Sequence, residues 1–575
     1  MPAPAVLIAG GGPVGLTLAA ELFRHGVPCR VIDKLIQPEV WSKAAAVQAR
    51  TLEVFRDMGV SDAILSRGRP VYGINIHKRA ERFAHVSTEV RGTPYPFILG
   101  ISQRETEDLL LEHLVALGGH LERGVTLEGF TAPGLDGAPD APGPITATLL
   151  HADGRREIIE VAALVGCDGA RSRVREVLGL PFEGSTFEEV VVQADVRVRF
   201  PFKTPQDEGL AFVAEGGPLV ALPLLAEGRY RVFAISPPDP EREPSLELFE
   251  ELAAARGPEG MEITDPLWMA KFRFHGRVVP SYRRGMVFLA GDAAHIHSPV
   301  GAQGMNMGIQ DAYNLAWKLA LVLRAKAQPR LLDSYDPERR PIGETTVQTT
   351  DRVTRAMARA MTLRSPLAQD LRNQAIAMLT GIGVLQDKAL QGIGGMTVNY
   401  AGSPAVGEHH TSVWRSNLAS DPDSELPQIG QWLNFSQGPG AGARVSDIDL
   451  PGHDGRTLFD LLQGTRHTLL LFDGASPSAA GYKNLTEIAE HVARLYGELI
   501  NVHIVVPAAA RPEALTFGGS ILLDPEGALH QHFHSGAESL SLIRPDGYVG
   551  FRSQPAEGRH LLHYLNTFFI RCSKR

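Results

Sequence analysis

Three glycines near the N-terminus have the spacing that a turn around a dinucleotide requires. Gly10, Gly12 and Gly15 stand in the order G-x-G-x-x-G. A short apolar strand is predicted before them, over residues 5–9, and a helix after them, over residues 13–25. The first glycine permits a tight turn, the second lets the backbone approach a pyrophosphate, and the third lets the helix pack on the sheet. The free amide groups of the helix and the positive end of its dipole would face the phosphates.

An acidic residue follows at the place where a ribose would lie. A second strand, predicted over residues 28–32, ends at Asp33. A carboxylate here can accept hydrogen bonds from ribose hydroxyls, and it disfavours a 2′-phosphate in the same pocket. We count the adjacent Lys34 among the predicted cofactor-binding residues. Strand, helix, second strand and acid together predict a dinucleotide site, and at this point FAD and NAD both remain open.

Two later stretches each contain a buried strand that ends in a turn of glycine and aspartate. One turn lies at Asp168, after an apolar strand that ends at Cys167. The other lies at Gly291 and Asp292, after a strand predicted over residues 286–290. A long helix then begins in a glycine-rich stretch that contains Gly301, Gly304, Asn306 and Gly308.

In this order the three motifs resemble those of the FAD-dependent aromatic hydroxylases, the family of p-hydroxybenzoate hydroxylase, phenol hydroxylase and the polyketide and rifampicin monooxygenases. The resemblance covers most of residues 1–345 and favours FAD over NAD. It implies that Asp292 hydrogen-bonds the ribityl chain of FAD, and that Asp168 and Arg175 serve both FAD and the pyridine nucleotide. The alternative is that Asp168 and Asp292 are ordinary turn or cap residues.

The same resemblance places Pro299 and the loop after it at the pyrimidine edge of the flavin, beside the carbon that binds oxygen. Pro299 and Gly301 are therefore the predicted catalytic residues. A helix N-terminus at this edge would stabilise the negative charge of reduced flavin. The alternative is that the glycines only let the helix pack closely. Cofactor contacts in this region are predicted for Gly291, Asp292, Gly304, Met305 and Asn306.

Two further stretches resemble flavin-contacting parts of the family. Residues 102–114 resemble the helix that carries a flavin-contacting glutamine, here Gln103, with Arg104 beside it. Residues 42–55 resemble the mobile segment over the flavin, with Arg50 in the setting R-T-L-E. Either arginine could instead be a surface salt-bridge residue.

The segment over the flavin departs from the family pattern. Relatives often have arginine and then glycines here, whereas this chain has Lys43, Ala45 and Ala46. We keep Lys43 among the predicted cofactor-binding residues. Because alanine restricts the backbone more than glycine does, the segment is predicted to be stiffer than in relatives whose flavin swings to meet NADPH.

The order of elements predicts an α/β fold. A Rossmann-like FAD-binding domain would carry an inserted antiparallel-sheet substrate domain, and a thioredoxin-like α/β domain would follow. The predicted boundaries are 1–69, 100–180 and 275–397 for the FAD-binding domain, 70–99 and 181–274 for the substrate domain, 398–443 for a linker, and 444–575 for the thioredoxin-like domain. The last resembles the C-terminal domain of the phenol and polyketide hydroxylases but lacks C-x-x-C, so we expect a structural or dimer-facing module without dithiol exchange.

Four residues of the predicted antiparallel sheet are candidates for the wall of a substrate pocket. They are Phe212, Pro223, Tyr230 and Phe233. All of them lie in runs that alternate apolar and polar residues, as half-buried strands do. Ordinary core packing explains such residues at least as well as a pocket wall does.

Composition excludes several classes of partner. The net charge is −9 and there is no block of lysine or arginine, which disfavours nucleic acid. No apolar run is long enough for a membrane span. Three widely spaced cysteines, without the spacing of metal ligands, indicate a reducing cytoplasm. His295 and His297 are predicted to pack or hydrogen-bond, and no metal is predicted.

The function that the resemblance implies is a single-component flavoprotein monooxygenase. It would use FAD, NADPH or NADH as transient reductant, and dioxygen to hydroxylate a small phenolic or other aromatic substrate through a flavin C4a-hydroperoxide. The alternatives are a Baeyer–Villiger or antibiotic-modifying flavin monooxygenase, a nicotinamide dehydrogenase, and a non-catalytic flavin-binding scaffold. A homodimer is compatible with the sequence.

Overall fold

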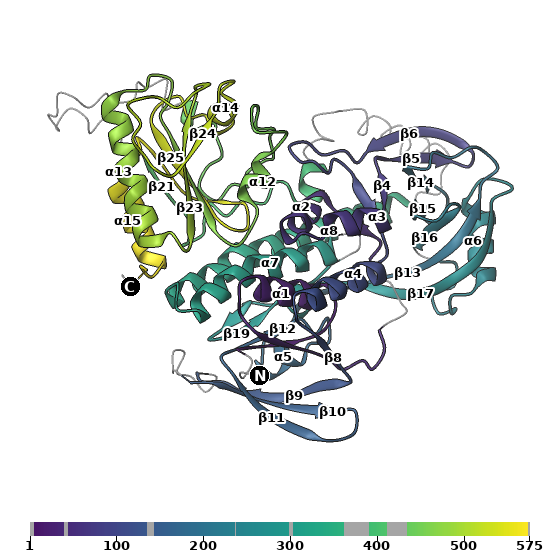
Figure 1. Ribbon diagram of the computed structural model, residues 1–575. Coiled ribbons are helices and arrows are strands. Elements are labelled where there is room, and N and C mark those ends of the chain that lie inside the picture. Colours follow the sequence, from purple (N-terminus) through teal and green to yellow (C-terminus); the bar gives the residue numbers. More distant parts are fainter. Residues whose placement is uncertain are drawn as a thin grey trace. The chain divides into compact units, whose positions relative to one another are not determined.

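The computed structural model describes residues 5–38, 44–134, 143–235, 237–297, 303–361, 390–410 and 434–572 (Figure 1). The chain is mixed α/β, as predicted, and it divides into two compact units. Unit 1 comprises Met1–Tyr313 and Arg339–Met396, and unit 2 comprises Asn314–Glu338 and Thr397–Arg575. The finer domain boundaries stay predictions.

A mostly parallel sheet forms the centre of unit 1. Its strand order is β18-β19-β12-β1-β2-β8, and only the β18–β19 pair is antiparallel. β1 and β12 are buried along their whole length, which is why they read as unbroken apolar runs. The strands predicted over 5–9, 28–32 and 286–290 are confirmed. The strands are β1 (Val6–Ala9), β2 (Cys29–Asp33), β8 (Leu121–Arg123), β12 (Ala163–Gly166), β18 (Arg283–Arg284) and β19 (Val287–Leu289).

Helices and two small sheets surround this sheet in unit 1. The helix predicted over 13–25 is confirmed as α1. The helices are α1 (Pro13–Arg24), α2 (Ala49–Met58), α3 (Ser61–Arg67), α4 (Gln103–Ala116), α5 (Arg173–Val177), the first part of α7 (Gly304–Leu323), and most of α8 (Tyr335–Met361), with a 3-10 turn η1 (Gly291–Ala293). The small sheets are β11-β10-β9 (Arg156–Val161, Ile145–His151, Val125–Thr131) and β3-β7-β4 (Ala46–Val47, Ile98–Gly100, Arg69–Val71).

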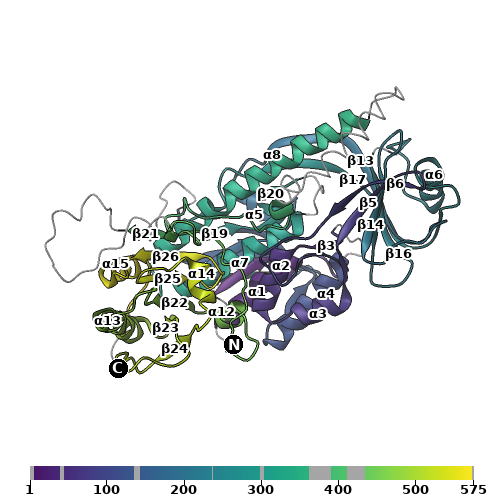
Figure 2. The ribbon, with the colours of Figure 1, turned by 90° about the horizontal axis from the view of Figure 1, so that it is seen from above.

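The predicted antiparallel sheet is present in unit 1. Its order is β20-β17-β13-β16-β15-β14-β5-β6, antiparallel except for the β14–β5 pair. The long strand β17 pairs with β13 near one edge of this sheet. Helix α6 (Leu246–Arg256) covers one face (Figure 2). The strands are β5 (Gly73–Lys78), β6 (Glu81–Ser87), β13 (Glu183–Arg199), β14 (Glu208–Phe212), β15 (Leu219–Pro223), β16 (Arg229–Ile235), β17 (Glu262–Val278) and β20 (His295–Ile296).

Unit 2 is built on a mixed sheet of order β21-β26-β25-β22-β23-β24. The second part of α7 contributes Trp317 and Leu321 to a core on one face of this sheet, together with α13 and α15. A smaller core lies around Phe472 and Phe533. The elements are β21 (Gly407–His410), α12 (Leu458–Leu462), β22 (His467–Phe472), α13 (Ala479–Tyr496), β23 (Ile500–Val506), β24 (Ser520–Leu523), α14 (Ala528–Phe533), β25 (Ser539–Ile543), β26 (Val549–Gln554) and α15 (Gly558–Phe568), with a 3-10 turn η2 (Pro329–Ser334).

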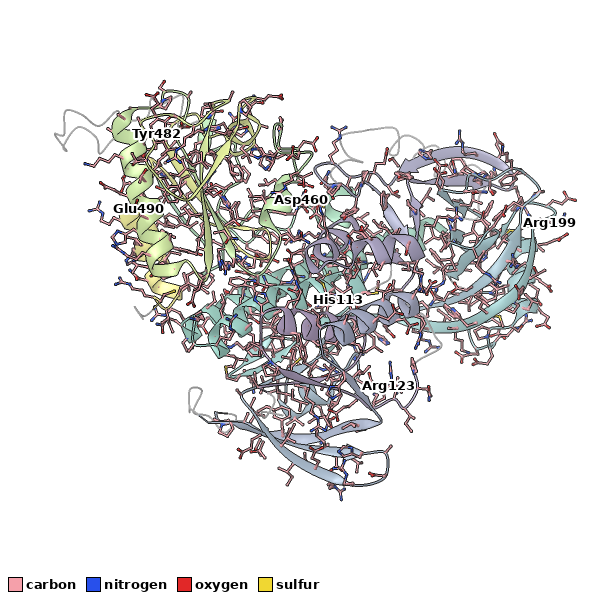
Figure 3. The ribbon with its side chains drawn as sticks, in the orientation of Figure 1. His113, Arg123, Arg199, Asp460, Tyr482 and Glu490 are labelled. Carbon is pink, nitrogen blue, oxygen red and sulfur yellow. The ribbon has the colours of Figure 1, made fainter. Side chains whose placement is uncertain are left out.

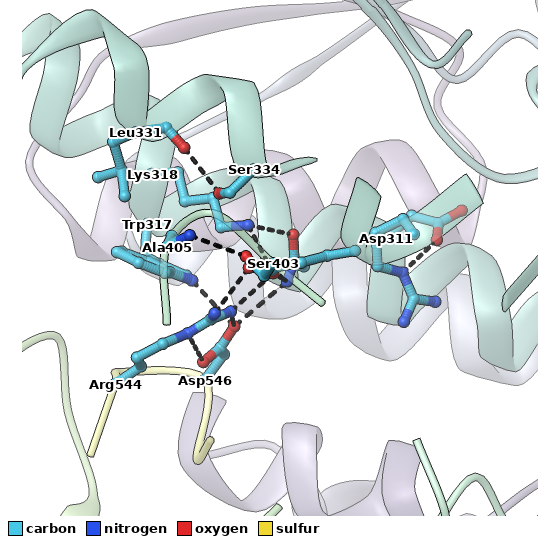
Figure 4. Close-up of polar contacts among 12 residues, drawn as sticks. Asp311, Trp317, Lys318, Leu331, Ser334, Ser403, Ala405, Arg544 and Asp546 are labelled. Atoms are coloured by element: carbon cyan, nitrogen blue, oxygen red, sulfur yellow. Dashed lines mark hydrogen bonds and ion pairs between the residues drawn. The ribbon is translucent and has the colours of Figure 1, made fainter. Parts of the chain in front are cut away.

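A fully buried group of charges lies inside unit 2. Lys318 Nζ is 2.7 Å from Glu338 Oε2, and Arg544 contacts the same carboxylate at 2.8 and 2.9 Å (Figure 4). Arg544 also pairs with Asp546, which accepts from Trp317 Nε1 at 3.1 Å. Two cations and two anions therefore balance one another out of contact with water.

Within the described segments, no helix is both long enough and apolar enough to span a bilayer.

Candidate active site

The glycine turn has the close approaches that its motif predicts. Gly10 has a φ of +109°, and a Cβ added there would lie 2.2 Å from the carbonyl oxygen of Cys167. A Cβ added at Gly15 would lie 2.0 Å from the carbonyl oxygen of Gly10. Both positions exclude any larger residue, because the atoms that would clash belong to the backbone. The turn is thus packed directly against the Asp168 turn.

Gly12 differs from its two partners, since the fold itself does not need a glycine there. Its backbone is extended (φ −81°, ψ −172°), and an added Cβ would meet only Glu107 Oε1, at 3.9 Å. Gly12 is the N-cap of α1, and no side chain within the described segments caps that helix. Uncapped amide groups beside open space at a helix start are what a pyrophosphate requires. The residues here fit FAD.

Asp33 lies at the end of β2, beside this turn. Its Oδ2 accepts from the Gly11 amide at 2.8 Å, and its Oδ1 accepts from the Leu35 amide at 2.8 Å. Each carboxylate oxygen can accept a second hydrogen bond, so a ribose hydroxyl remains compatible with these contacts. Lys34 is exposed. Arg123, labelled in Figure 3, is the register partner of Asp33 on β8 and was missed by the sequence prediction.

Asp168 holds the second turn and has one unsatisfied oxygen. Oδ2 accepts from the amides of Arg173 at 2.6 Å and Val174 at 3.1 Å. Oδ1 is buried and has no hydrogen-bond partner among the described residues. Burial raises the pKa of this carboxyl above its ordinary value. An orphaned buried acceptor is costly, and a hydroxyl or amide donor from a bound cofactor would satisfy it.

Arg175 links the Asp168 turn to the Gly291 turn. Its Nη2 donates to the carbonyl oxygen of Ala170 at 2.7 Å, and its Nη1 donates to that of Ala293 at 3.0 Å. The guanidinium lies over the Phe182 ring, 3.9 Å from the centroid. Two motifs that are about a hundred residues apart in sequence are therefore side by side, as a shared site requires.

The Gly291 turn is held in place by the buried carboxylate of Asp311. Its Oδ2 accepts from the Gly291 amide at 3.1 Å and lies 2.8 Å from His295 Nε2, while Oδ1 accepts from Arg339 Nε at 2.7 Å. Burial alone would raise the pKa of Asp311, but Arg339 and then His295 outweigh it and hold the pKa below its ordinary value. The hydrogen bond predicted for His295 is confirmed. Asp292 itself is exposed.

The start of α7 lies close to the first helix and to the segment at residues 46–48. Asn306 Oδ1 accepts from the Gln48 amide at 2.9 Å, and its Nδ2 donates to the Ala46 carbonyl oxygen at 3.0 Å. A Cβ on Gly308 would lie 2.6 Å from Val14 of α1, and Figures 1 and 2 show the two helices together. Close packing therefore explains Gly308.

The remaining predicted residues of this region are placed as follows. Gly304 and Met305 are half-buried in the first turn of α7. Pro299, Gly301 and Lys43 lie outside the described residues.

Gln103 is fixed at the start of α4 by the capping box of Ser102 and Glu105. Such caps contribute about 1 kcal/mol. Gln103 Oε1 accepts from the Ala44 amide at 3.3 Å, and its Nε2 donates to Glu107 Oε1 at 2.8 Å. Gln103 therefore connects the glycine turn, through Glu107, with the segment that precedes α2.

The two arginines beside these stretches have different environments. Arg50 is buried and its Nη1 donates to Glu53 at 2.9 Å, so it is not a surface salt-bridge residue. Arg104 pairs with Asp108 at 2.6 Å and is 37% exposed, as the surface alternative predicted.

A buried ion pair in the antiparallel sheet was missed by the sequence prediction. Arg231 on β16 donates to Asp195, its register partner on β13, and Trp268 Nε1 donates to the same carboxylate at 2.8 Å. Arg231 Nη1 also donates to the carbonyl oxygen of Ala44 at 3.3 Å. Nothing in the sequence signals this pair, because Asp195 and Arg231 stand at polar positions of alternating runs, where exposed residues are expected.

The candidate residues for the wall of the substrate pocket lie on different faces of the antiparallel sheet. Phe212 and Tyr230 lie in the core under α6 and do not face a site. Phe233 lies on the opposite face, the one that carries Arg231, in a partly buried group with Ile235 and Phe272. Pro223 is buried, with its carbonyl oxygen 2.7 Å from where a Cβ on Gly100 would be. Phe233 is thus the candidate that stays with the site.

Glu107→Gln is expected to tighten FAD binding by a few fold. Burial raises the pKa of Glu107 above its ordinary value, and Gln103 opposes that shift. A carboxylate beside the glycine turn repels a pyrophosphate once it ionises, so the FAD affinity of the wild type should fall more steeply with rising pH than that of the variant. FAD titration of the apoprotein between about pH 5 and about pH 8 measures this. Glu112→Gln, exposed on the same helix, is the control, and equal pH dependence in all three proteins would contradict the prediction.

Comparisons with known proteins agree with this arrangement. The family model described as "FAD binding domain" matches residues 4–350. The 6-methylpretetramide 4-monooxygenase of Streptomyces rimosus is 34% identical over 96% of this chain and 91% of its own length. The pentachlorophenol 4-monooxygenase of Sphingobium chlorophenolicum is 32% identical over 99% of this chain and 97% of its own. The solved structure of OxyS anhydrotetracycline hydroxylase from Streptomyces rimosus aligns with a TM-score of 0.69 at 27% identity, over 98% of both chains.

Proposed function

Because the chain belongs to the FAD-binding-domain family and is an FAD-dependent aromatic monooxygenase that uses NAD(P)H and dioxygen, we propose that it hydroxylates a phenolic ring within a fused, polycyclic substrate. The observation that carries this proposal is the partly buried apolar face of Phe233, Ile235 and Phe272, on the side of the sheet where Arg231 reaches Ala44. A flat fused-ring system can cover such a face. A relative that acts on 6-methylpretetramide supports the same class.

The residues of unit 1 divide the work of holding the cofactor. The amides at the start of α1 would bind the pyrophosphate, and Asp33 would accept from a ribose. Asp168 Oδ1 would take a donor from the cofactor, and Arg175 would keep its turn beside the Gly291 turn. When bound, FAD supplies the hydride acceptor and the oxygen transfer. We also assign cofactor contacts to Gly10, Gly12, Gly15, Lys34, Lys43, Arg50, Gln103, Gly291, Asp292, Gly304, Met305 and Asn306.

Other residues of this chain position the reacting groups and exclude water. Arg231, fixed by Asp195 and Trp268, holds the backbone at Ala44 and so positions the segment beside Gln103. The amides around Pro299, Gly301 and the start of α7 would stabilise negative charge at the flavin edge. Phe233 would cover one face of the substrate ring and keep water from it, through apolar contacts that the bound substrate and the transition state share.

We also propose that unit 2 contains a thioredoxin-like module without redox chemistry. Its β22 is followed by the loop Asp473–Ser478 and helix α13, which is where a dithiol pair would stand. The sequence has no cysteine in this loop. The module would therefore serve stability or assembly.

The purified holoprotein tests the proposed function. Oxidation of NADH and NADPH is followed with a tetracyclic phenol and with pentachlorophenol, and products are identified by mass. We expect strong stimulation by the tetracyclic phenol and a product with one added oxygen atom on the ring. Stimulation by single-ring phenols alone would overturn the substrate class, and ring expansion of a ketone would favour the Baeyer–Villiger alternative.

Phe233→Ala is expected to raise the KM for the polycyclic substrate about tenfold, with kcat nearly unchanged. The lost apolar contact acts equally on bound substrate and transition state, and tenfold corresponds to about 1.4 kcal/mol. Steady-state kinetics measure the split, and flavin absorbance checks the holoenzyme. Leu267→Ala, which removes an exposed side chain from β17, is the matched control. An unchanged KM would remove Phe233 from the substrate site.

A further inference from the structure

Three side chains with metal-ligand chemistry converge at one edge of the unit 2 sheet. They are His409 on β21, Glu557 at the N-cap of α15, and His560 in the first turn of that helix. We propose that they form a binding site for a divalent transition-metal ion of the Zn²⁺ type. The proposal is independent of the flavin site, because all three residues belong to unit 2.

The ligand atoms already lie near the spacing that a bound ion needs. His560 Nε2 is 3.0 Å from Glu557 Oε2, and His409 Nε2 is 3.7 Å from the same oxygen. One ligand atom from each residue lies within 4.8 Å of the other two. With metal–ligand bonds of about 2.0–2.2 Å, tetrahedral ligands stand roughly 3.3–3.5 Å apart. Each Nε2 lone pair lies in the plane of its ring, so the two stacked rings must rotate apart for both to point at one ion.

The fold explains why these residues meet. β21 pairs in parallel with β26, with His409 opposite Ser553, and the chain then turns through Glu557 into α15. Glu557 and His560 are separated by three positions, the spacing that brings helix side chains together. The Tyr564 hydroxyl donates to the carbonyl oxygen of Ala405 at 2.9 Å and holds the segment before β21 on the helix. Figure 1 shows β21 near α15.

Side chains alternate between the two faces of a strand, so His409 and its two neighbours in β21 lie on opposite faces. Glu408 accepts from Arg552 at 2.7 Å, which shows that the alternate side chains of β21 face away from α15. His410 shares that direction and is exposed. The adjacent histidine therefore provides a control that differs only in the face on which it lies.

The chemistry of the group favours a metal over a plain ion pair. The two imidazole rings lie face to face, with centroids 3.5 Å apart at 15°. Neutral imidazoles and a carboxylate are the donors that zinc uses, with water at the remaining position. The side chains are 29% exposed at His409, 30% at Glu557 and 35% at His560, so an ion can reach all three.

Binding would fasten the edge strand β21 to α15. On its open side β21 pairs with no other strand of the described residues, so a cross-link there would protect the sheet edge. An ion that binds only the folded form also raises stability by mass action. The predicted role is structural, and the flavin reaction does not depend on it.

Calorimetric titration of the chelator-treated full-length holoprotein with zinc chloride tests the proposal. We expect one equivalent to bind per chain and the melting temperature to rise. His409→Ala and His560→Ala should each weaken binding at least about tenfold, equivalent to 1.4 kcal/mol. His410→Ala should bind as the wild type does. Unchanged flavin absorbance and far-UV circular dichroism show that each variant is folded.

Cobalt substitution gives a second readout. Bound Co²⁺ should show the visible absorption of a low-coordinate site with nitrogen ligands in the wild type and in His410→Ala. Glu557→Gln, which keeps the size of the side chain, should weaken the binding of both Zn²⁺ and Co²⁺. Absence of a stoichiometric zinc site, or equal loss in His410→Ala and His409→Ala, would overturn the proposal in favour of a metal-free imidazole and carboxylate pair.

Discussion

Gly12→Ala is expected to abolish FAD retention while the protein stays folded. The backbone at Gly12 is extended, and the added methyl group would meet only Glu107 Oε1, at 3.9 Å. The fold therefore tolerates alanine, with a loss of at most about 1 kcal/mol at a helix N-cap. A pyrophosphate that approaches the backbone here would collide with the methyl group. We expect FAD affinity to fall at least about 100-fold, or 2.7 kcal/mol.

The flavin content after desalting and titration of the apoprotein with FAD measure this effect, and thermal unfolding reports on the fold. Gly129→Ala is the matched control, because an added Cβ in that strand would meet no atom within 4 Å. Gly15→Ala should differ from Gly12→Ala in its effect on the fold. Its Cβ would lie 2.0 Å from a backbone oxygen, so both the fold and FAD binding should be lost. Wild-type FAD affinity in Gly12→Ala would show that the pyrophosphate lies elsewhere.

Local patterns were sufficient to predict the elements that build the glycine turn. β1, α1 and β2 are set by an apolar run, a proline at the start of the helix and the glycine spacing, all of which act over a few residues. The contact between Gly10 and Cys167 follows from the same logic, because parallel neighbouring strands end at one edge of the sheet. The convergence of the motifs was thus predictable from their type and order.

Contacts made by long side chains across elements were not predictable in this way. Glu107 was one of several acids in α4, and nothing in the sequence shows that its carboxylate reaches the glycine turn. The hydrogen bond from Arg231 to Ala44 joins residues far apart in the chain, and it depends on the register of β13 against β16. Likewise, Lys318 and Asp311 are the two charged residues of the largely apolar helix α7, and the partner of Lys318, Glu338, is found only once α7 and α8 are placed.

Glu338→Gln is expected to destabilise unit 2 by about 3–5 kcal/mol, because the change leaves Arg544 and Lys318 buried with only one anion, Asp546. Burial alone would raise the pKa of Glu338, but Arg544 and Lys318 hold it far below its ordinary value. That stabilisation is present above the unfolded pKa of 4.5 and lost as pH falls, so the gap between variant and wild type should shrink in acid. Denaturant unfolding and hydrogen exchange in β25 measure the difference in unfolding free energy between variant and wild type. Glu344→Gln, whose carboxylate pairs with Arg340 near the surface of the same helix, should cost no more than about 0.5 kcal/mol, and equal losses in the two variants would contradict the prediction.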